Sequence, residues 1–349
     1  MSDSLGKLGH HELGWVKQGG SPRDIGLALG RAGREAVQRH LPTSEYFRAI
    51  TGPAHAAAVA RMARATRARF PAIWAEIEGL AEGLEMPLAD VFAWNCRGDL
   101  LARVPDGCTT VMVPGDMPVL AHNEDGLPFF RGSCFIADAA PQDGPAFRSF
   151  CYPGSIPGHT FAFNEAGLAQ TVNNIRLTGT EPDIPRMVLG RAVIGSRSLD
   201  EALAVLEGGA GSGGFHFALS STADRRILSV EFGRGEVSVR QIEAVTAHAN
   251  HALHHEWGLA HQIVTESSRD RQIRADALVG QGLDPLSILR DEGGAGLPIW
   301  RDGADDPDDE NTLGTAVFRL ASDGIHWSIH DRPTGPAAYR GTGIKALAT

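Results

Sequence analysis

The stretch from residue 106 to residue 113 carries the clearest chemical signal in this sequence. Gly107 directly precedes Cys108, and a strand-like apolar run follows at Val111-Met112-Val113. Because glycine has no Cβ, a thiol at position 108 can approach the preceding carbonyl. An N-to-S acyl shift at this bond, followed by attack of water, would cleave the chain and make Cys108 a new N-terminus. The freed α-amine, with an ordinary pKa of about 7.7–8, suits general-base catalysis near neutral pH.

A second polar cluster, His122 to Asp125, ends the next expected strand at residues 119–122. A hairpin through residues 114–116 would bring the end of that strand back beside Cys108. Asp125 could then orient the amine or the thiol of residue 108. A strand-end turn with solvated carboxylates is the alternative that this cluster leaves open.

Two asparagines, Asn173 and Asn174, end an apolar strand expected at residues 168–173. A side-chain amide there could donate to the oxyanion of a tetrahedral intermediate, an effect of roughly 3–4 kcal/mol. The alternative is an ordinary turn, since asparagine tolerates left-handed backbone conformations.

Four histidines lie within eight residues, at positions 248, 251, 254 and 255. Such a density raises the possibility of a zinc site. However, no HExxH motif is present, and the histidines expected on a helix, His251 and His255, have no acidic partner nearby in the sequence. We therefore predict no metal site, and a metal-binding role for these histidines stays an alternative.

The segment before Cys108 is predicted to be helical, after an edge strand or arm up to about Gly20, and the segment after it to be rich in antiparallel strands. Helices are expected at residues 22–41, 54–70, 71–84, 87–94, 185–196, 198–207, 267–280 and 285–290, and strands at 110–113, 119–122, 133–137, 148–151, 160–164, 168–173, 215–221, 227–232, 236–242, 315–320 and 326–330. Gly26 and Gly30 share one face of the first helix, which is typical of close helix packing. Residues 303–310 predict an exposed acidic loop. Segregated helices and antiparallel strands indicate an α+β fold.

Composition narrows the classes of function. The 349 residues carry a formal net charge of -10, which argues against nucleic acid or an anionic membrane as partner. The first residues lack the apolar core of a signal peptide, so we expect a cytoplasmic protein. Four scattered cysteines favour neither a disulfide framework nor a zinc ribbon. The glycine-rich stretch 208–214 lacks the Lys-Ser/Thr of a phosphate loop, and we predict no cofactor.

Taken in order, these motifs resemble the acyl-coenzyme A:6-aminopenicillanic-acid acyltransferase family of N-terminal-nucleophile hydrolases, which is related to penicillin V acylases and bile-salt hydrolases. The resemblance extends over nearly the whole chain. The segments that carry it are Glu78 to Gly83 with Trp94-Asn95, Gly107 to Thr110, Asn123-Glu124-Asp125, Asn164 to Leu168 with Asn173, His248 to His251, and Ser267 to Arg271. Glu124 departs from the family's Asn-Trp-Asp motif, where an aromatic residue is common.

The resemblance implies a four-layer αββα sandwich and self-cleavage between Gly107 and Cys108. Residues 1–107 would become a helical α chain and residues 108–349 a catalytic β chain, and the two would stay packed as one globular unit. The catalytic residues implied are Cys108 as nucleophile and base, Asp125 holding the new terminus, Asn173 as oxyanion donor and Arg271 as the family's arginine. The substrate-binding residues implied are Glu124, Asn174, Asn250, His251, Ser268 and Arg269. Arg269 competes with Arg271 for the arginine position, and Asn174 is the reserve for Asn173.

We therefore expect a zymogen that matures into a cysteine amidohydrolase and cleaves a small N-acylated amine or amino acid through an acyl-Cys108 intermediate. An acid at position 124 would favour a cationic amine as substrate. An acyltransferase that passes the acyl group to another amine is the first alternative. Two others are an uncleaved cysteine enzyme that uses His122 or His248 as base, and a non-catalytic or metal-binding relative. The expected partners are the substrate and the cleaved N-terminal fragment, and a homo-oligomer is left open.

Overall fold

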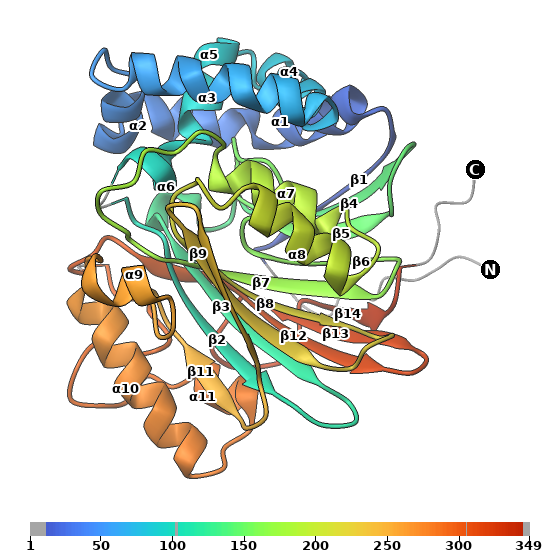
Figure 1. The fold of residues 1–349 in the computed structure, drawn as a ribbon, viewed down its shortest axis with the longest axis vertical. Coiled ribbons are helices and arrows are strands. Elements are labelled where there is room, and N and C mark those ends of the chain that lie inside the picture. Colours follow the sequence, from blue (N-terminus) through green and yellow to red (C-terminus); the bar gives the residue numbers. More distant parts are fainter. Residues whose placement is uncertain (1–11, 102–103, 305, 345–349) are drawn as a thin grey trace.

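The computed structural model describes residues 12–101, 104–304 and 306–344, which form two β-sheets surrounded by helices (Figure 1). In spatial order, the eight-stranded sheet contains β1 (Gly14–Gly20), β4 (Phe135–Pro141), β5 (Phe147–Cys151), β6 (Phe161–Asn164), β7 (Leu168–Asn174), β8 (Phe215–Ser221), β9 (Ile227–Gly233) and β10 (Glu236–Gln241). The six-stranded sheet contains β11 (Thr246–His248), β2 (Gly107–Val113), β3 (Val119–Gly126), β12 (Asn311–Ala321), β13 (Gly324–His330) and β14 (Tyr339–Thr342).

The helices fall into three groups along the chain. The first group comprises α1 (Pro22–His40), α2 (Glu45–Ile50), α3 (Ala56–Arg69), α4 (Pro71–Leu84), α5 (Leu88–Trp94) and α6 (Arg97–Leu100). The second comprises α7 (Arg186–Ile194) and α8 (Leu199–Gly208), and the third α9 (Glu256–Ala260), α10 (Glu266–Gly280) and α11 (Pro285–Leu289). Short 3₁₀ helices occupy Leu41–Thr43 and Pro128–Phe130. In the part of the chain that the structure describes, no helix combines the length and apolar character needed to span a bilayer.

The two sheets pack face to face. Thr110 of β2 and Thr171 of β7 bring their hydroxyl oxygens within 3.2 Å, and the rings of Phe163 and Phe318 have centroids 5.3 Å apart. Side chains alternate along a strand, so the same strands send every second residue to the opposite face. The chemistry described below lies at one end of this interface, where β2, β3 and β7 meet.

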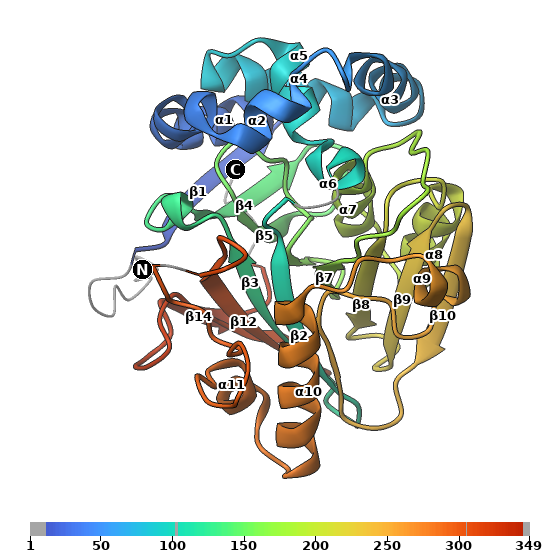
Figure 2. The ribbon, with the colours of Figure 1, turned by 90° about the vertical axis from the view of Figure 1, so that its left-hand side faces the viewer.

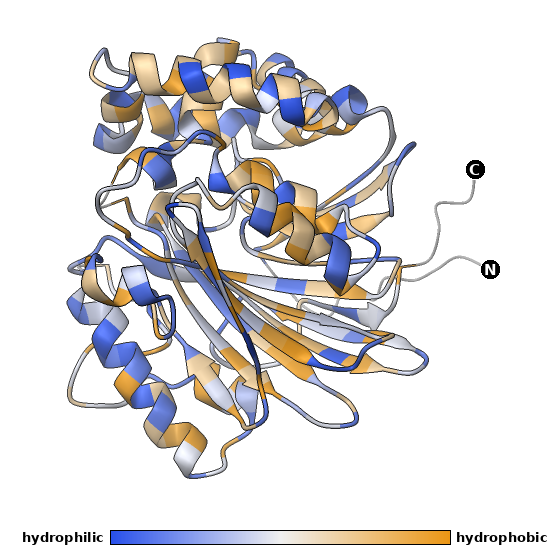
Figure 3. Cartoon of the chain, in the orientation of Figure 1, coloured by the Kyte–Doolittle hydropathy of each residue, from blue (hydrophilic) through white to orange (hydrophobic). Residues whose placement is uncertain are grey.

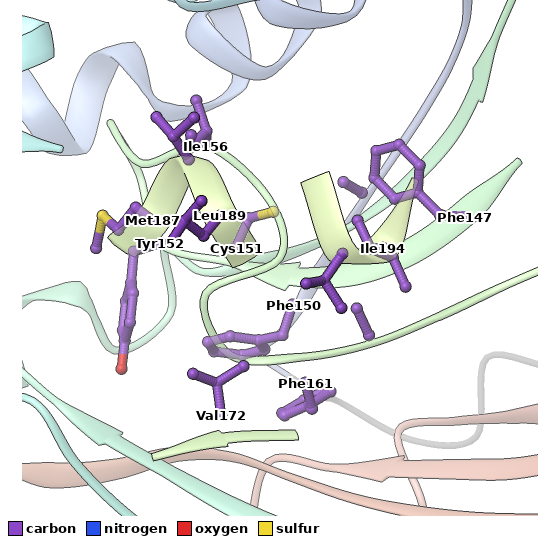
Figure 4. Close-up of a cluster of buried hydrophobic side chains, with 14 of the residues drawn as sticks. Phe147, Phe150, Cys151, Tyr152, Ile156, Phe161, Val172, Met187, Leu189 and Ile194 are labelled. Atoms are coloured by element: carbon purple, nitrogen blue, oxygen red, sulfur yellow. The ribbon is translucent and has the colours of Figure 1, made fainter. Parts of the chain in front are cut away.

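Helices cover the other faces of the sheets. Next to the six-stranded sheet, Val111 and Ala121 pack with Leu278 of α10 and Leu289 of α11 in a separate apolar cluster. Next to the eight-stranded sheet, α7 contributes Met187, Leu189 and Ile194 to the apolar cluster shown in Figure 4. Figure 3 shows the strands largely hydrophobic, whereas α10 alternates hydrophilic and hydrophobic residues along its length.

Helices α1 and α4 pack through glycines, as the spacing of Gly26 and Gly30 predicts. A Cβ added to Gly26 would lie 1.9 Å from the carbonyl oxygen of Glu76, and one added to Gly30 would lie 2.4 Å from that of Leu80. Side chains of any size would push the two backbones apart. This prediction is confirmed.

Most predicted elements are present, and the errors lie at their ends. The edge strand expected up to about Gly20 is present, because β1 lies at the edge of the eight-stranded sheet and pairs parallel with β4. Strand β3 continues to Gly126, four residues beyond its predicted end, because its pairing with β2 and β12 continues that far. Strand β14 was not predicted from the sequence.

Candidate active site

The hairpin of β2 and β3 places the two chemical motifs side by side. Strands β2 and β3 lie side by side (Figure 2), and in their antiparallel register Cys108 faces Glu124 and Gly107 faces Asp125. The predicted hairpin is therefore confirmed, while the strand-end turn is wrong: His122 to Asp125 lie inside a strand and are fully buried. Alternation sends Glu124 to the same side of the strand as His122.

Every polar group of Cys108 is engaged by another segment of the chain. Its N–H donates to Asn250 Oδ1 at 2.7 Å, its carbonyl accepts from Arg271, and its thiol lies 3.7 Å from Glu124 Oε2. The residue is 2% exposed. Burial, together with the acids Glu124 and Asp106, raises the pKa of this thiol well above its usual value. A proton acceptor is therefore needed before the sulfur can attack a carbonyl.

The N-terminal half of helix α10 contacts this site, and the buried side chains there are polar. Thr265 caps the helix by accepting from the N–H of Ser268. Arg271 is 1% exposed and donates to the Cys108 carbonyl, to Thr109 Oγ1 at 2.9 Å and to Asn250 Oδ1 at 2.7 Å. Arg269 is exposed on the opposite side. The structure therefore places Arg271, and not Arg269, beside Cys108.

Residues 248–255 form a turn rather than the helix expected around His251 and His255. Ser268 Oγ accepts from the N–H of Asn250 at 2.9 Å and lies 2.8 Å from His251 Nδ1. The Asn250 amide also donates to the Asn174 carbonyl at 3.2 Å. Three residues predicted to bind substrate, Asn250, His251 and Ser268, are thus brought together, with Asn250 in direct contact with the nucleophile.

Glu231 of β9 holds this turn in place, and the sequence prediction missed it. Its carboxylate accepts from the N–H groups of Leu253, His254 and His255 at 2.6–2.9 Å and lies 2.8 Å from His248 Nε2. The signal in the sequence is a single acid inside the apolar run 227–232. The histidines at 248 and 254 therefore gather around a structural carboxylate, an arrangement that does not favour the metal-binding alternative.

Glu231 predicts a measurable pH dependence of stability. Burial opposes its charge, but the hydrogen bond and charge of His248, with the backbone donors, outweigh burial and lower its pKa from 4.5 to about 2. A lowered carboxyl pKa stabilises the fold above the unfolded-state value and loses this contribution as pH falls from about 4.5 toward 2. E231Q should therefore lose about 3 kcal/mol of unfolding free energy at pH 7. Denaturant unfolding of both proteins between pH 7 and pH 3 measures this; a difference that does not shrink below pH 4.5 would contradict it.

The two asparagines at the end of β7 lie in different surroundings. Asn173 donates to the His248 carbonyl at 3.1 Å, and its Oδ1 accepts from Thr110 Oγ1 at 2.7 Å. No hydrogen bond joins its side chain to Cys108 among the described residues. Asn174 approaches more closely, because its backbone N–H faces the Cys108 thiol and its amide lies 3.4 Å from the Asp106 carbonyl. The oxyanion role of Asn173 stays a prediction.

Asp125 and Gly107 form the other side of the site. Asp125 Oδ1 accepts from Thr312 Oγ1 at 2.6 Å, while its buried Oδ2 has no hydrogen-bond partner among the described residues. Burial raises the pKa of this carboxyl, against the nearby cations Arg271 and Arg301. An unpartnered, buried carboxylate oxygen beside residue 107 is a suitable receptor for an amine formed there.

Glu310 closes the site from the acidic loop, which was predicted to be exposed. The end of that loop instead turns inward: Glu310 is 2% exposed, accepts from the Asp106 N–H at 3.0 Å and pairs with Arg176 and Arg301. The correction has a physical reason, since two buried guanidinium groups compensate this carboxylate. No sequence spacing indicates the contact, because 204 residues separate Asp106 from Glu310.

The position of Glu310 makes Gly107 sterically necessary. A Cβ on residue 107 would lie 2.2 Å from Glu310 Oε2 and 3.3 Å from Asp125 Cβ. G107A is therefore expected to shift the 107–108 peptide bond. If the chain cleaves itself there, as the sequence predicts, a time course of fragment formation should show cleavage slowed at least about tenfold. G280A is the matched control, because nothing lies within 4 Å of a Cβ at that position. Cleavage of G107A at the wild-type rate would refute the steric role.

A cleft of about 420 Å³ opens beside the residues that precede the nucleophile. Its lining includes Val104, Arg176, Thr265, Asp308 and Glu310. Asp106, Gly107 and Cys108 do not line this cleft, but Glu310 does, and Glu310 accepts from the Asp106 N–H.

One group of side chains is compact enough to share a metal ion. Ligand atoms of Cys108, His122 and Glu124 lie within 4.8 Å of one another, which no other group achieves in the described parts of the chain. These atoms already contact one another, with His122 Nε2 3.1 Å from Glu124 Oε2. Burial lowers the pKa of His122 to about 3, so its imidazole is neutral. Hydrogen bonds among Cys108, Glu124 and His122 therefore account for these short distances, and no metal ion is needed to explain them.

Comparison with known proteins points to one family. The model of the acyl-coenzyme A:6-aminopenicillanic acid acyl-transferase family matches residues 112–333, more than half of the chain, beginning four residues after Cys108. A beta-alanyl-dopamine/carcinine hydrolase from Drosophila melanogaster is 29% identical over 160 residues, which cover 40% of this chain and 41% of that protein. The matched stretch is thus under half of the relative's length.

Proposed function

Because the chain belongs to the acyl-coenzyme A:6-aminopenicillanic acid acyl-transferase family, we propose that it is a self-processing cysteine amidohydrolase. The family and the hydrolase relative support an enzyme that acts on amide bonds. The finer proposal rests on one observation: the N–H, carbonyl and thiol of Cys108 are each bound by a different polar side chain, namely Asn250, Arg271 and Glu124. Such complete engagement of a single buried residue fits a reaction centre.

We propose that cleavage after Gly107 frees the Cys108 amine, which then serves as the base. In the mature enzyme the amine takes the thiol proton, and the sulfur attacks the substrate carbonyl. The unpartnered Oδ2 of Asp125 supports its proposed role in holding the charged form of this amine. Proton return to the leaving amine and attack of water on the acyl-cysteine complete hydrolysis.

The sequence predicts Asn173 as the oxyanion donor, but the geometry favours other groups. Asn250 touches the Cys108 N–H, and the backbone N–H of Asn174 faces the thiol. Asn173 is engaged elsewhere. Asn250, however, presents its acceptor Oδ1 to the Cys108 N–H, while its Nδ2 donates to the Asn174 carbonyl. We therefore propose the backbone N–H of Asn174 as the nearest donor to a developing oxyanion, with Asn250 and Asn173 positioning the segments around it.

We propose a small N-acylated amine as substrate. The relative is by name a hydrolase of beta-alanyl-dopamine and carcinine. The cleft beside residue 104 is lined by the acids Glu266, Asp308 and Asp309, in addition to the paired Glu310 and Arg176. Acidic lining suits a substrate with a cationic group. Glu124, in contrast, is 0% exposed and bound by neighbours, so the cleft rather than Glu124 is the better place for that selectivity. Transfer of the acyl group to a second amine is the alternative outcome.

The proposal extends to the architecture of the mature protein. The pairwise packing of α7 with one sheet and α10 and α11 with the other supports a four-layer αββα sandwich. Strand β1 in the eight-stranded sheet supports a cleaved N-terminal segment that stays bound. We keep a cytoplasmic location as part of the proposal.

Intact mass spectrometry of the purified protein tests the function directly. Two fragments that meet at Gly107/Cys108, together with release of amine from a panel of β-alanyl and simple N-acyl amides, are expected. Adding a second amine to the assay separates hydrolysis from acyl transfer. An uncleaved chain without amidase activity would refute the proposal.

A further inference from the structure

Glu124 is a buried acid without a basic side chain to balance it. It is 0% exposed. Among the described residues, the basic side chain within ion-pair distance is His122, which is neutral and therefore does not balance the charge. Tyr152, whose hydroxyl points away from the apolar cluster in Figure 4, donates to Oε1 at 2.7 Å. The Cys108 thiol donates to Oε2 at 3.7 Å. The neighbouring carboxylate Glu310, by comparison, is paired with two arginines.

The first reaction of the proposed pathway lacks a base. The α-amine of Cys108 becomes available only after the chain is cut, because until then its nitrogen is an amide that donates to Asn250. Self-cleavage therefore needs another group to remove the thiol proton. Among the described residues, the acidic or basic side chain that is hydrogen-bonded to the sulfur is Glu124.

We propose that Glu124 is the proton shuttle of self-cleavage, a role that rests on the proposed function. Its carboxylate takes the proton from the Cys108 thiol while the sulfur bonds to the Gly107 carbonyl carbon. When the carbon–nitrogen bond breaks, Glu124 returns that proton to the departing nitrogen, which becomes the α-amine. Water then cleaves the thioester, releasing the Gly107 carboxylate and restoring the thiol.

The surroundings of Glu124 suit this exchange. Burial and the nearby Asp106 raise the pKa of the carboxyl well above its usual value, and burial likewise raises the pKa of the thiol. The raised pKa favours the protonated carboxyl, so the exchange requires Glu124 in its ionised form, in which it is a stronger base than an ordinary carboxylate. The hydroxyl of Tyr152 and the imidazole of His122 fix its two oxygens in place.

The test follows cleavage during cell-free synthesis of the full chain, with E124Q compared to wild type. We expect E124Q to cleave about 100-fold more slowly, the usual lower range for loss of a positioned acid–base group. E76Q is the matched control, since Glu76 is equally buried but pairs with Arg191 outside the site. E124Q cleaving at the wild-type rate would overturn the proposal while leaving the proposed function intact; an uncleaved wild type would refute self-processing itself.

A second variant keeps the test sharp if E124Q is misfolded. E124A creates space at the carboxylate, and added formate is expected to restore its cleavage in a concentration-dependent manner, whereas chloride is not. Failure of formate to restore cleavage in an E124A protein with a normal thermal transition would overturn the shuttle. So would loss of wild-type cleavage in a chelator, because Glu124 would then act as a metal ligand with Cys108 and His122.

Discussion

Replacing Cys108 with alanine is expected to leave a single uncut chain and to reduce amide hydrolysis to background, a loss on the order of 10⁵-fold. In the proposed mechanism both reactions use the same sulfur, which attacks first the Gly107 carbonyl and then the substrate. Removal of the thiol leaves Asn250 and Arg271 in place around residue 108, so the fold should persist. Intact mass and an amide-hydrolysis assay on the same preparation measure the two losses together.

The matched control for this variant is C134A. Cys134 is also buried and free, but its thiol donates to the Phe130 carbonyl rather than to Glu124. C134A should cleave and hydrolyse like wild type. If C108A stayed uncleaved but active, the nucleophile would have to lie elsewhere. If wild type were uncleaved but active, the base would move to a histidine, and His122, next to Glu124, is better placed than His248, which is bound to Glu231.

The sequence was most informative where chemistry depends on neighbours along the chain. The Gly107–Cys108 pair and the short link at residues 114–116 predict a hairpin, and the hairpin alone places Glu124 opposite Cys108. A period-two pattern with turn residues is sufficient for such a local result. Segments farther away, such as 248–251 and 267–271, were found through their order in the resemblance, not through any geometric signal of their own.

The rest of the site is made by contacts that no spacing announces. Glu310, Thr312 and Tyr152 reach Asp106, Asp125 and Glu124 from distant parts of the chain. A tyrosine beside an apolar strand resembles ordinary core until its hydroxyl partner is known. Roles also changed within a motif: alternation along β3 directs Asp125 toward Gly107 and Glu124 toward the sulfur, a division that residue types alone do not reveal.

The second large effect is expected at Arg271, because one guanidinium connects four groups of the site. It donates to the Cys108 carbonyl, Thr109 Oγ1, Asn250 Oδ1 and Ser267 Oγ. R271A would remove this donor from the Cys108 carbonyl and Thr109 Oγ1, whereas Asn250 Oδ1 keeps the Cys108 N–H and Ser267 Oγ keeps Arg301. We expect the loss to cost about 3 kcal/mol of unfolding free energy. It would also release the peptide bond on the far side of Cys108, so cleavage should become undetectable. Fragment formation and denaturant unfolding measure the two effects.

R271K separates charge from geometry. A lysine retains the positive charge, but its compact ammonium cannot reproduce the planar fork that reaches Cys108 and Asn250 together. We expect R271K to recover stability to within about 1 kcal/mol of wild type and still to cleave roughly 100-fold more slowly. R269A, altered on the exposed side of the same helix, should change stability by less than about 0.5 kcal/mol and should still cleave. The reverse pattern, with R269A uncut and R271K normal, would show that the motif is shifted by two residues and that Arg271 has a structural role only.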